Sequence, residues 1–177
     1  MCERIVNEIS ALEGSASVVY GRAESGVVHD AARKSLRLTP STETVGLITG
    51  RLQACMDQVA RHFGVKLSEY EDPQFLRYQV GDFFVAHQDG NTGMLRLDTD
   101  RRLVSTVIFL SREAETASEG VYCGGSLVFT NYRAAPERAK FHVRAEPGTL
   151  IAFRSETTHE VTPVTHGLRY SIVSWYR

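Results

Sequence analysis

Two histidines and one aspartate have the residue types and the spacing to bind a metal ion. His87 and Asp89 lie two residues apart at the end of an apolar segment that we predict to be a strand. Residues i and i+2 of a strand point to the same face, so the imidazole and the carboxylate would converge. His159 opens another predicted strand and offers a third ligand. Two imidazoles and one carboxylate leave other coordination positions open, which suits Fe(II) at a reactive centre.

Each of these residues also has a structural interpretation. A His-x-Asp pair at a strand end often faces solvent, and His159 alone would be read as a surface histidine. A structural zinc site would need a fourth Cys or His ligand. The spacing places none beside the three residues, although Cys123 stays open as a candidate. The open ligand set therefore favours a reactive metal over a structural one.

Arg169 begins the last predicted strand, residues 168–176, and follows His159 by ten positions. Strand alternation puts Arg169 and Ser171 on one face and Tyr170 on the other. If the first face points inward, the guanidinium donates two parallel hydrogen bonds and the hydroxyl a third, which makes a carboxylate receptor. If the other face points inward, Arg169 is a surface charge. Alternation alone leaves both readings open.

Helices precede the strands that must position these side chains. Apolar residues at helical spacing predict a short helix over residues 5–12 that ends near Gly14. A longer helix is predicted with Thr39 as its N-cap, Pro40 as its first residue and Gly64 as its end. Its apolar stripe is Val45, Ile48, Leu52, Cys55, Val59 and Phe63. Residues 17–20 are a further candidate strand, and residues 27–38 read as irregular or partly extended.

From residue 74 onward, short β-segments alternate with glycine-containing turns. The predicted strands are 75–80, 83–87, 103–111, 126–130, 141–144, 149–153, 159–164 and 168–176. Eight such strands favour a jelly roll, also called a double-stranded β-helix. We therefore expect a mainly β protein with flanking helices, the N-terminal helices being packed on one face of the roll. We expect one domain over 1–177, with 1–72 as helical support and 73–177 as the jelly-roll core.

Composition narrows the possible partners. The chain has 177 residues and a formal net charge of −1, so no overall positive field attracts nucleic acid or anionic lipid. No apolar run is long enough to span a bilayer, and the first residues lack the pattern of a secretory leader. Three widely spaced cysteines form neither a disulfide framework nor a zinc ribbon. We expect a cytoplasmic protein that binds neither membrane nor nucleic acid; its oligomeric state is left open.

Five ordered stretches resemble the Fe(II)- and 2-oxoglutarate-dependent oxygenases, in their prolyl-4-hydroxylase-like branch. The resemblance covers most of the chain, and the ordered set is more specific than any one piece. The stretches are Tyr78-Gln79-Val80-Gly81 with His87-Gln88-Asp89, Gly124 to Phe129, Pro147 to Phe153, His159 to Val164, and Gly167-Leu168-Arg169-Tyr170-Ser171. Arg33-Lys34-Ser35 also looks like the short Arg-x-Ser element that precedes the core in this branch.

The resemblance implies that His87, Asp89 and His159 bind Fe(II). It implies that Arg169 holds the distal carboxylate of 2-oxoglutarate, with Ser171 and Tyr78 as hydrogen-bonding helpers. The implied activity uses O2, with ascorbate as a possible reductant, and hydroxylates an unactivated C–H bond while 2-oxoglutarate becomes succinate and CO2. A carboxylate at position 89 favours hydroxylation, because halogenating relatives carry a small residue there. Trp175, Phe109 and Val161 are candidates for the pocket wall.

Two positions depart from related patterns. Phe109 stands where oxygen-sensing prolyl hydroxylases place a second tyrosine hydroxyl, so one hydrogen bond to 2-oxoglutarate is missing. Trp175 stands where nucleic-acid-repair relatives carry a second arginine, which argues against DNA or RNA as substrate. The expected substrate is an amino acid, a prolyl peptide or another small metabolite. Loops 90–102 and 112–124 are candidates for a lid or for plain solvated connections.

Two other classes remain open on the residues alone. A cupin-like metal enzyme without 2-oxoglutarate would share the roll and the histidines but would not need an inward Arg169 and Ser171. A non-catalytic jelly-roll binding module would tolerate the loss of the metal altogether.

Overall fold

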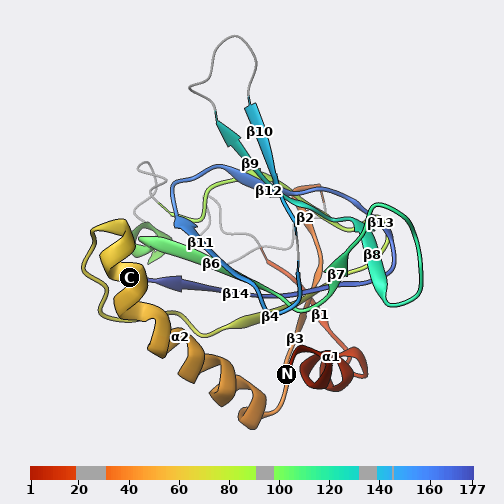
Figure 1. Cartoon of the computed structure of the whole chain (residues 1–177), viewed down its shortest axis with the longest axis horizontal. Coiled ribbons are helices and arrows are strands. Elements are labelled where there is room, and N and C mark those ends of the chain that lie inside the picture. Colours follow the sequence, from red (N-terminus) through yellow and green to blue (C-terminus); the bar gives the residue numbers. More distant parts are fainter. Residues whose placement is uncertain (19–30, 91–97, 132–138, 145) are drawn as a thin grey trace.

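The fold is mostly β, as the spacing of turns and apolar residues predicts. A computed structural model describes residues 1–18, 31–90, 98–131, 139–144 and 146–177. Its helical elements are α1 (Cys2–Ser10), α2 (Thr42–Phe63) and the 3₁₀ turn η1 (Asp98–Arg101). Its strands are β1 (Ser15–Ala16), β2 (Arg33–Lys34), β3 (Leu36–Leu38), β4 (Gln74–Tyr78), β5 (Phe83–His87), β6 (Val104–Phe109), β7 (Arg112–Glu113), β8 (Val121–Gly124), β9 (Leu127–Asn131), β10 (Ala139–Val143), β11 (Leu150–Arg154), β12 (His159–Val161), β13 (Val164–His166) and β14 (Arg169–Tyr176). Figure 1 shows their arrangement.

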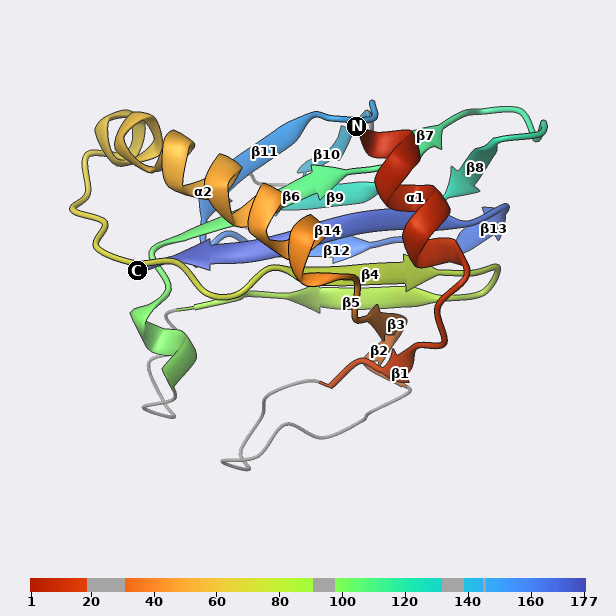
Figure 2. The same ribbon diagram turned by 90° about the horizontal axis from the view of Figure 1, so that it is seen from below.

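Two sheets carry the residues of interest. One has the strand order β1-β3-β4-β14-β6-β11, and the other has the order β10-β9-β12-β5-β2. Strand β14 lies in the middle of the first sheet, antiparallel to both β4 and β6. Strand β5 lies between β12 and β2 in the second. Helices α1 and α2 lie together over one face of the six-stranded sheet (Figure 2).

Strand β14 is buried on both faces, and its alternation separates two environments. Tyr170, Ile172 and Tyr176 face the helices and belong to the larger apolar core. Arg169 and Ser171 lie on the opposite face and line a cavity inside the roll. The inward reading of Arg169 is therefore the correct one.

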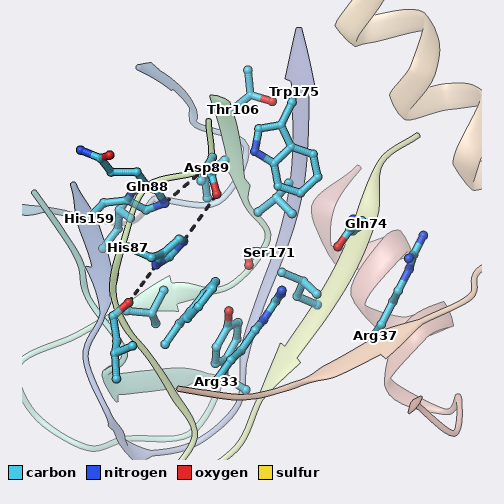
Figure 3. A pocket seen from close by; sticks show the side chains of 18 of the residues that line it. Arg33, Arg37, Gln74, His87, Gln88, Asp89, Thr106, His159, Ser171 and Trp175 are labelled. Atoms are coloured by element: carbon cyan, nitrogen blue, oxygen red, sulfur yellow. Dashed lines mark hydrogen bonds and ion pairs between the residues drawn. The ribbon is translucent and has the colours of Figure 1, made fainter. Parts of the chain in front are cut away.

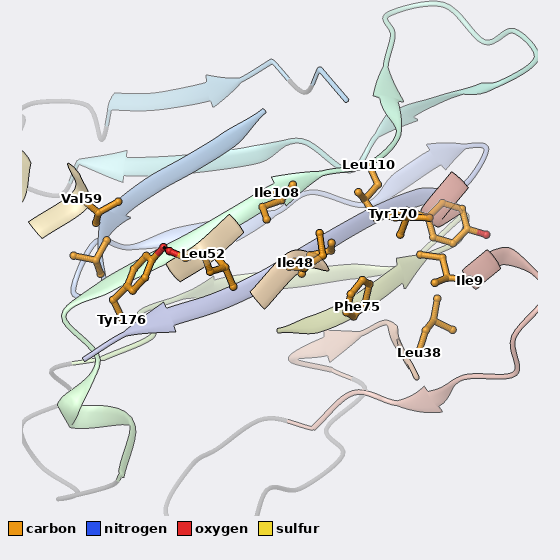
Figure 4. Close-up of a cluster of buried hydrophobic side chains, with 13 residues drawn as sticks. Ile9, Leu38, Ile48, Leu52, Val59, Phe75, Ile108, Leu110, Tyr170 and Tyr176 are labelled. Carbon is orange, nitrogen blue, oxygen red and sulfur yellow. Dashed lines mark hydrogen bonds between the residues drawn. The ribbon is translucent and has the colours of Figure 1, made fainter. Parts of the chain in front are cut away.

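The larger core lies between the two helices and the six-stranded sheet (Figure 4). Ile5 and Ile9 from α1, and Ile48, Leu52 and Val59 from α2, all belong to it. On the sheet side it contains Phe75, Val104, Ile108, Tyr170, Ile172 and Tyr176, among others. Burial of such side chains contributes roughly 1.5 to 3 kcal/mol each, so the apolar stripe of α2 secures the outer face of the sheet.

Helix α2 begins two residues later than the sequence predicts. Ser41, and not Thr39, is the N-cap, and its side chain accepts a hydrogen bond from the Thr44 amide at 3.3 Å. Thr44 also donates its hydroxyl to Glu8 at 2.5 Å, which ties α1 to the start of α2. The predicted end is correct, because Gly64 caps the helix with a φ of 64°, a conformation that glycine adopts without strain.

Several predicted strands differ in extent. The segment 159–164 divides into β12 and β13, and β7 and β8 were not predicted. The candidate strand at 17–20 is displaced, since the strand there is β1 at Ser15–Ala16; residues 19 and 20 fall outside the described part of the chain. The same holds for residues 91–97 of the candidate lid. Neither helix in the described ranges is long and apolar enough to cross a membrane.

Candidate active site

The structure brings His87, Asp89 and His159 together at one end of the cavity. One potential ligand atom from each residue lies within 4.8 Å of the others. The Nε2 atom of His87 lies 3.5 Å from Asp89 Oδ1, and the Nε2 atom of His159 lies 3.5 Å from Asp89 Oδ2. Ligand atoms roughly 2.1 Å from a shared metal ion are about 3 to 4 Å apart. The spacing therefore suits one metal ion.

Backbone carbonyls orient both imidazoles in the same way. His87 Nδ1 lies 2.8 Å from the Val85 carbonyl oxygen, and His159 Nδ1 lies 2.9 Å from the Thr157 carbonyl oxygen. A neutral imidazole that donates from Nδ1 leaves its Nε2 lone pair free. Both free lone pairs then face Asp89, which is the arrangement that a metal ligand requires.

Strand pairing explains why His87 and His159, 72 positions apart in the sequence, meet. Strands β5 and β12 are antiparallel neighbours, and His159 pairs directly with His87. The register of β12 against β5 shifts between His159 and Val161, directly after the paired histidines. Beyond β5, the Asp89 and Gly90 amides both donate to the Ser155 carbonyl, at 2.9 and 3.1 Å. The backbone of the acidic residue is thus fixed next to the paired histidines.

Burial and mutual proximity shift the pKa values of this cluster. Burial lowers the pKa of His159 to about 4, and only part of this effect is offset by the Asp89 carboxylate. Burial alone would raise the pKa of Asp89, but the adjacent imidazoles of His87 and His159 outweigh it and hold that pKa well below its usual range. At neutral pH the cluster therefore presents an anionic carboxylate and a neutral His159, the forms that bind a cation.

Aromatic rings support the two imidazoles. The Phe84 ring stacks on His87 with centroids 3.5 Å apart and an angle of 17° between planes. Phe153 contacts His159 edge-on at 4.7 Å. These contacts limit ring rotation and keep the cluster on the apolar side of the cavity.

A cavity of about 320 Å³ extends from the three residues into the roll (Figure 3). Arg169 lies in its wall and is only 2% exposed. Its Nη1 donates to Ser171 Oγ at 2.8 Å, whereas its buried Nε has no hydrogen-bond partner within the described residues. Tyr78 pairs with Arg169 across β4 and β14, and its ring centroid is 5.1 Å from the guanidinium carbon.

The predicted wall residues do not all reach the cavity. Trp175 and Val161 line it. Phe109 does not: it packs in the smaller core beneath Arg169, with its ring centroid 5.6 Å from the guanidinium carbon. The reason is that Phe109 lies on β6, where its side chain joins Val107, Tyr122 and Leu127.

Other lining residues were not assigned to the site from the sequence. Arg102, Arg37 and Gln74 line the cavity, as does Arg33 of the Arg-x-Ser element. Arg102 lies over the Trp175 ring at 3.7 Å and is bound by both oxygens of Glu71, each at 2.6 Å. The sequence pointed to two of these lining residues indirectly: Arg33 through the Arg-x-Ser resemblance and Arg102 through the candidate lid 90–102.

Comparison with known proteins agrees with the geometry. Residues 73–177 match the family model described as the 2OG-Fe(II) oxygenase superfamily. A PKHD-type hydroxylase of Janthinobacterium sp. (strain Marseille) is 31% identical over 179 residues, spanning 96% of this chain and 72% of that protein. A PKHD-type hydroxylase of Burkholderia cenocepacia (strain HI2424) is 31% identical over 171 residues, spanning 91% of this chain and 67% of that protein.

Solved structures share the fold. A Pseudomonas putida prolyl-4-hydroxylase aligns with a TM-score of 0.64 and 20% identity, covering 100% of this chain and 99% of that one. A prolyl hydroxylase of Trichoplax adhaerens, in complex with a hypoxia inducible factor peptide, aligns with a TM-score of 0.67 and 20% identity, covering 99% and 77%. The family match, the similar hydroxylases and the convergent histidines and aspartate lead to one conclusion: this chain belongs to the 2OG-Fe(II) oxygenase superfamily and is an Fe(II)- and 2-oxoglutarate-dependent hydroxylase, with a fold similar to that of prolyl-4-hydroxylases.

Proposed function

We propose that His87, Asp89 and His159 bind the Fe(II) ion of this hydroxylase and that Arg169, with Ser171 and Tyr78, binds the distal carboxylate of 2-oxoglutarate. The observation that carries the proposal is the placement of a buried arginine and the His-Asp-His cluster in the wall of one cavity. The 2-oxo acid end of the co-substrate needs the metal ion, and its distal carboxylate needs a cationic side chain.

The donor set fits Fe(II). Two imidazoles whose Nε2 atoms face Asp89, together with that carboxylate, would supply three protein ligands, and a non-haem iron of this type keeps its other positions open for co-substrate and O2. Cys123 is buried and pairs with His166 on β13, so no thiolate is brought into this donor set. The site is therefore open, as a reactive centre must be and a structural zinc site is not.

Arg169 fits the 2-oxoglutarate carboxylate. It is almost fully buried, and no carboxylate in the described part of the chain forms an ion pair with it. Its known partner, the Ser171 hydroxyl, is neutral. A buried guanidinium without a counter-ion is unfavourable, so a bound dicarboxylate supplies what the fold omits. Phe109 lies beside the guanidinium without contributing a hydroxyl, whereas the buried Tyr122 hydroxyl also lies near Arg169.

The protein side of the mechanism consists of binding, orientation and exclusion of water. When bound, Fe(II) would supply the activation of O2, with one oxygen atom entering the C–H bond and the other the succinate that forms, together with CO2, from 2-oxoglutarate. The carbonyls of Val85 and Thr157 hold the imidazoles in their ligand orientation. Trp175 and Val161 contribute apolar surface to the cavity wall.

The substrate proposed here is an amino acid, a prolyl peptide or another small metabolite, and not a nucleic acid. The hydroxylase named for Trichoplax adhaerens is bound to a peptide, which supports the prolyl candidate by analogy. The net charge of −1 and the presence of Trp175 in place of a second arginine support the exclusion of DNA and RNA. The three free cysteines support a reducing compartment such as the cytoplasm.

Thermal unfolding with Mn(II), an inert substitute for Fe(II), tests this assignment. We expect 2-oxoglutarate to raise the Tm of the Mn(II)-loaded protein in a saturable way, because it binds only the folded state. Replacement of Arg169 by Ala should abolish the 2-oxoglutarate shift while the shift caused by Mn(II) alone remains. Arg169→Lys should keep part of it, because the charge is retained but the two-pronged hydrogen bonding is lost.

Arg112→Ala is the matched control. Arg112 is an exposed arginine whose only described role is a surface ion pair with Glu146 at 3.6 Å. It should keep the full 2-oxoglutarate shift. An Arg169→Ala protein that is stabilised by 2-oxoglutarate as strongly as the unaltered protein would reject Arg169 as the anchor.

A further inference from the structure

We infer that the substrate of this hydroxylase is a small carboxylic acid and that Arg33 binds its carboxylate. The inference rests on the proposed function, because it takes Arg169 as the anchor of 2-oxoglutarate and asks which cation is left for the substrate.

Strand pairing places Arg33 close to the metal-ligand cluster. Arg33 pairs with Phe84 across strands β2 and β5, and its guanidinium carbon lies 4.8 Å from the Phe84 ring centroid. The other neighbour of that ring is the His87 imidazole, stacked on it at 3.5 Å. A single aromatic ring thus links the Arg33 guanidinium to the first proposed ligand. In Figure 3 the Arg33 side chain extends from its strand into the space that His87 borders.

Arg33 is buried but lacks a counter-ion. It is 8% exposed. Its Nε donates to Ser35 Oγ at 3.1 Å, and its Nη1 donates to the Val18 carbonyl at 3.2 Å. Both acceptors are neutral, and the Ser35 hydroxyl in turn donates a hydrogen bond to Ser17 Oγ at 2.8 Å. None of the ion pairs formed among the described residues involves Arg33.

The donors of this guanidinium are not exhausted. A guanidinium has five N–H groups, and two hydrogen bonds to neutral acceptors leave donors for an anion. Burial of an uncompensated charge is unfavourable. An anion bound in the cavity would therefore accept hydrogen bonds from the remaining N–H groups of Arg33 and compensate its charge.

Charge within the cavity wall points to the same residue. Among the residues that the structure describes, the lining contains four arginines, Arg33, Arg37, Arg102 and Arg169, and a single carboxylate, Asp89. Glu71 neutralises Arg102 through two contacts of 2.6 Å. Arg169 and the metal are matched by 2-oxoglutarate and Asp89 under the proposed function. Arg33 remains, together with the exposed Arg37 of strand β3 in the other sheet, as positive charge in the lining that a substrate anion would balance.

Cavity size limits what that anion can be attached to. About 320 Å³ must accommodate 2-oxoglutarate and the reacting part of the substrate together. This favours a free amino or organic acid over a long chain. With its carboxylate on Arg33, such a molecule would present a C–H bond a few bonds away toward the His-Asp-His end.

Paired probes test the inference directly. The Mn(II)-loaded protein, saturated with 2-oxoglutarate, is titrated calorimetrically with L-proline, L-leucine, L-lysine and L-methionine and with the carboxamide of each. N-acetyl-prolyl carboxamide serves as the neutral peptide probe. We expect at least one acid to bind at least tenfold more tightly than its carboxamide. A panel in which no acid is preferred over its amide, or in which the neutral peptide probe binds most tightly, overturns the inference.

Substitution then assigns the preference to Arg33. In Arg33→Gln, the acid-to-amide preference should fall toward one, while the Kd for 2-oxoglutarate stays within twofold. Gln keeps a donor for Ser35, and a merely structural role of Arg33 would weaken acid and amide equally. Arg33→Lys should keep part of the preference. A preference that persists undiminished in Arg33→Gln rejects Arg33 as the anion site.

Lys34→Gln is the matched control, because it removes one positive charge from the same strand at an exposed side chain that pairs with Asp82 at 3.6 Å. It should leave the acid-to-amide preference unchanged. If Arg33→Gln does not fold, the paired titration of the unaltered protein decides. If the unaltered protein does not bind 2-oxoglutarate in a metal-dependent way, the proposed function is refuted. If it binds 2-oxoglutarate but does not prefer the acids over their carboxamides, only this inference is refuted.

Discussion

Single side chains of the site depend on backbone groups for their orientation. The His87 and His159 rings each face a backbone carbonyl through Nδ1, so their Nε2 atoms are set before a metal arrives. Asp89 lies between them, and its hydrogen bond with His87 and the proximity of both imidazoles lower the pKa of its carboxyl group, so that the carboxylate stays ionised. Preorganisation of this kind lowers the entropy that metal binding would otherwise lose. It also leaves the metal-free protein with a buried, neutral His159.

Acid should destabilise the metal-free protein through His159. The pKa of this group is about 4 in the folded protein and 6.5 as an ordinary histidine. The unfolded chain therefore binds more protons between these values, so stability falls as the pH is lowered through this window, by up to about 1.4 kcal/mol per pH unit. The depressed pKa of Asp89 removes further stability only below its ordinary value of 3.8, where the unfolded chain takes up a proton at this carboxylate and the folded protein does not.

Urea unfolding in the presence of a chelator measures this dependence. His159→Asn should show a flatter loss of stability between pH 6.5 and 4 than the unaltered protein. His62→Asn, at an exposed position on α2, should keep the original slope. Equal slopes for His159→Asn and the unaltered protein would contradict the buried neutral state of His159.

Strand ends, more than whole strands, decide the geometry at the level of elements. The chain leaves β5 at His87 and turns so tightly at Gly90 that a Cβ there would lie 2.7 Å from the Arg102 carbonyl oxygen and 3.1 Å from Ser155 Cβ. The two amides after Gln88 are both held by Ser155. Close backbone packing, and not a side-chain contact, therefore fixes the main chain at Asp89.

Alanine at two glycines should have opposite effects. Gly90→Ala should destabilise the protein by about 1 to 3 kcal/mol and weaken Mn(II) binding, because the added methyl displaces the segment that carries Asp89. Gly50→Ala, on α2 with no atom within 4 Å of the new methyl, should stabilise it by about 0.5 to 1 kcal/mol and leave Mn(II) affinity unchanged. Denaturant unfolding and metal titration measure both; a Gly90→Ala protein with normal metal affinity would show that this packing does not position Asp89.

The comparison of sequence with structure is also clearest at this scale. Alternation in β14 correctly separated Arg169 and Ser171 from Tyr170, because successive side chains of a strand point to opposite faces. Since both faces of β14 are buried, the sequence pattern did not show which face points into the cavity. Strand β2 has only two residues, so periodicity could not reveal that Arg33 faces the cavity. The start of α2 was misplaced because Thr39 and Ser41 are both good N-caps, and only the hydrogen bond to Thr44 distinguishes them.

At the scale of the molecule, the six-stranded sheet separates the helical layer from the cavity inside the roll. The six-stranded sheet presents the helices with a continuous apolar face and presents the cavity with Arg169, Ser171 and Trp175. Parts of this plan follow from the sequence, because the helices precede the strands and each carries one apolar stripe. The convergence of His87 with His159 was predicted only through the family resemblance, because residue spacing does not reveal the long-range pairing of β5 and β12.

Two tyrosines at the boundary between helices and sheet should respond differently to loss of their hydroxyl. Tyr176 donates its hydroxyl to the Leu52 carbonyl of α2 at 2.7 Å, so Tyr176→Phe should lower stability by about 1 kcal/mol. Within the described residues the buried Tyr170 hydroxyl has no partner, so Tyr170→Phe should be neutral or slightly stabilising. Thermal unfolding compares the two, and 2-oxoglutarate binding should stay normal in both. A larger loss of stability in Tyr170→Phe than in Tyr176→Phe would contradict the described role of the Tyr176 hydroxyl in attaching α2 to the sheet.

Diffraction from crystals containing Mn(II) and 2-oxoglutarate is the most direct test of the shared metal and co-substrate site. The anomalous signal of manganese should give one strong peak about 2.0 to 2.3 Å from His87 Nε2, His159 Nε2 and an Asp89 oxygen. The far carboxylate of 2-oxoglutarate should contact the Arg169 guanidinium. A manganese peak elsewhere in the molecule, or a co-substrate whose far carboxylate turns away from Arg169, would contradict this account.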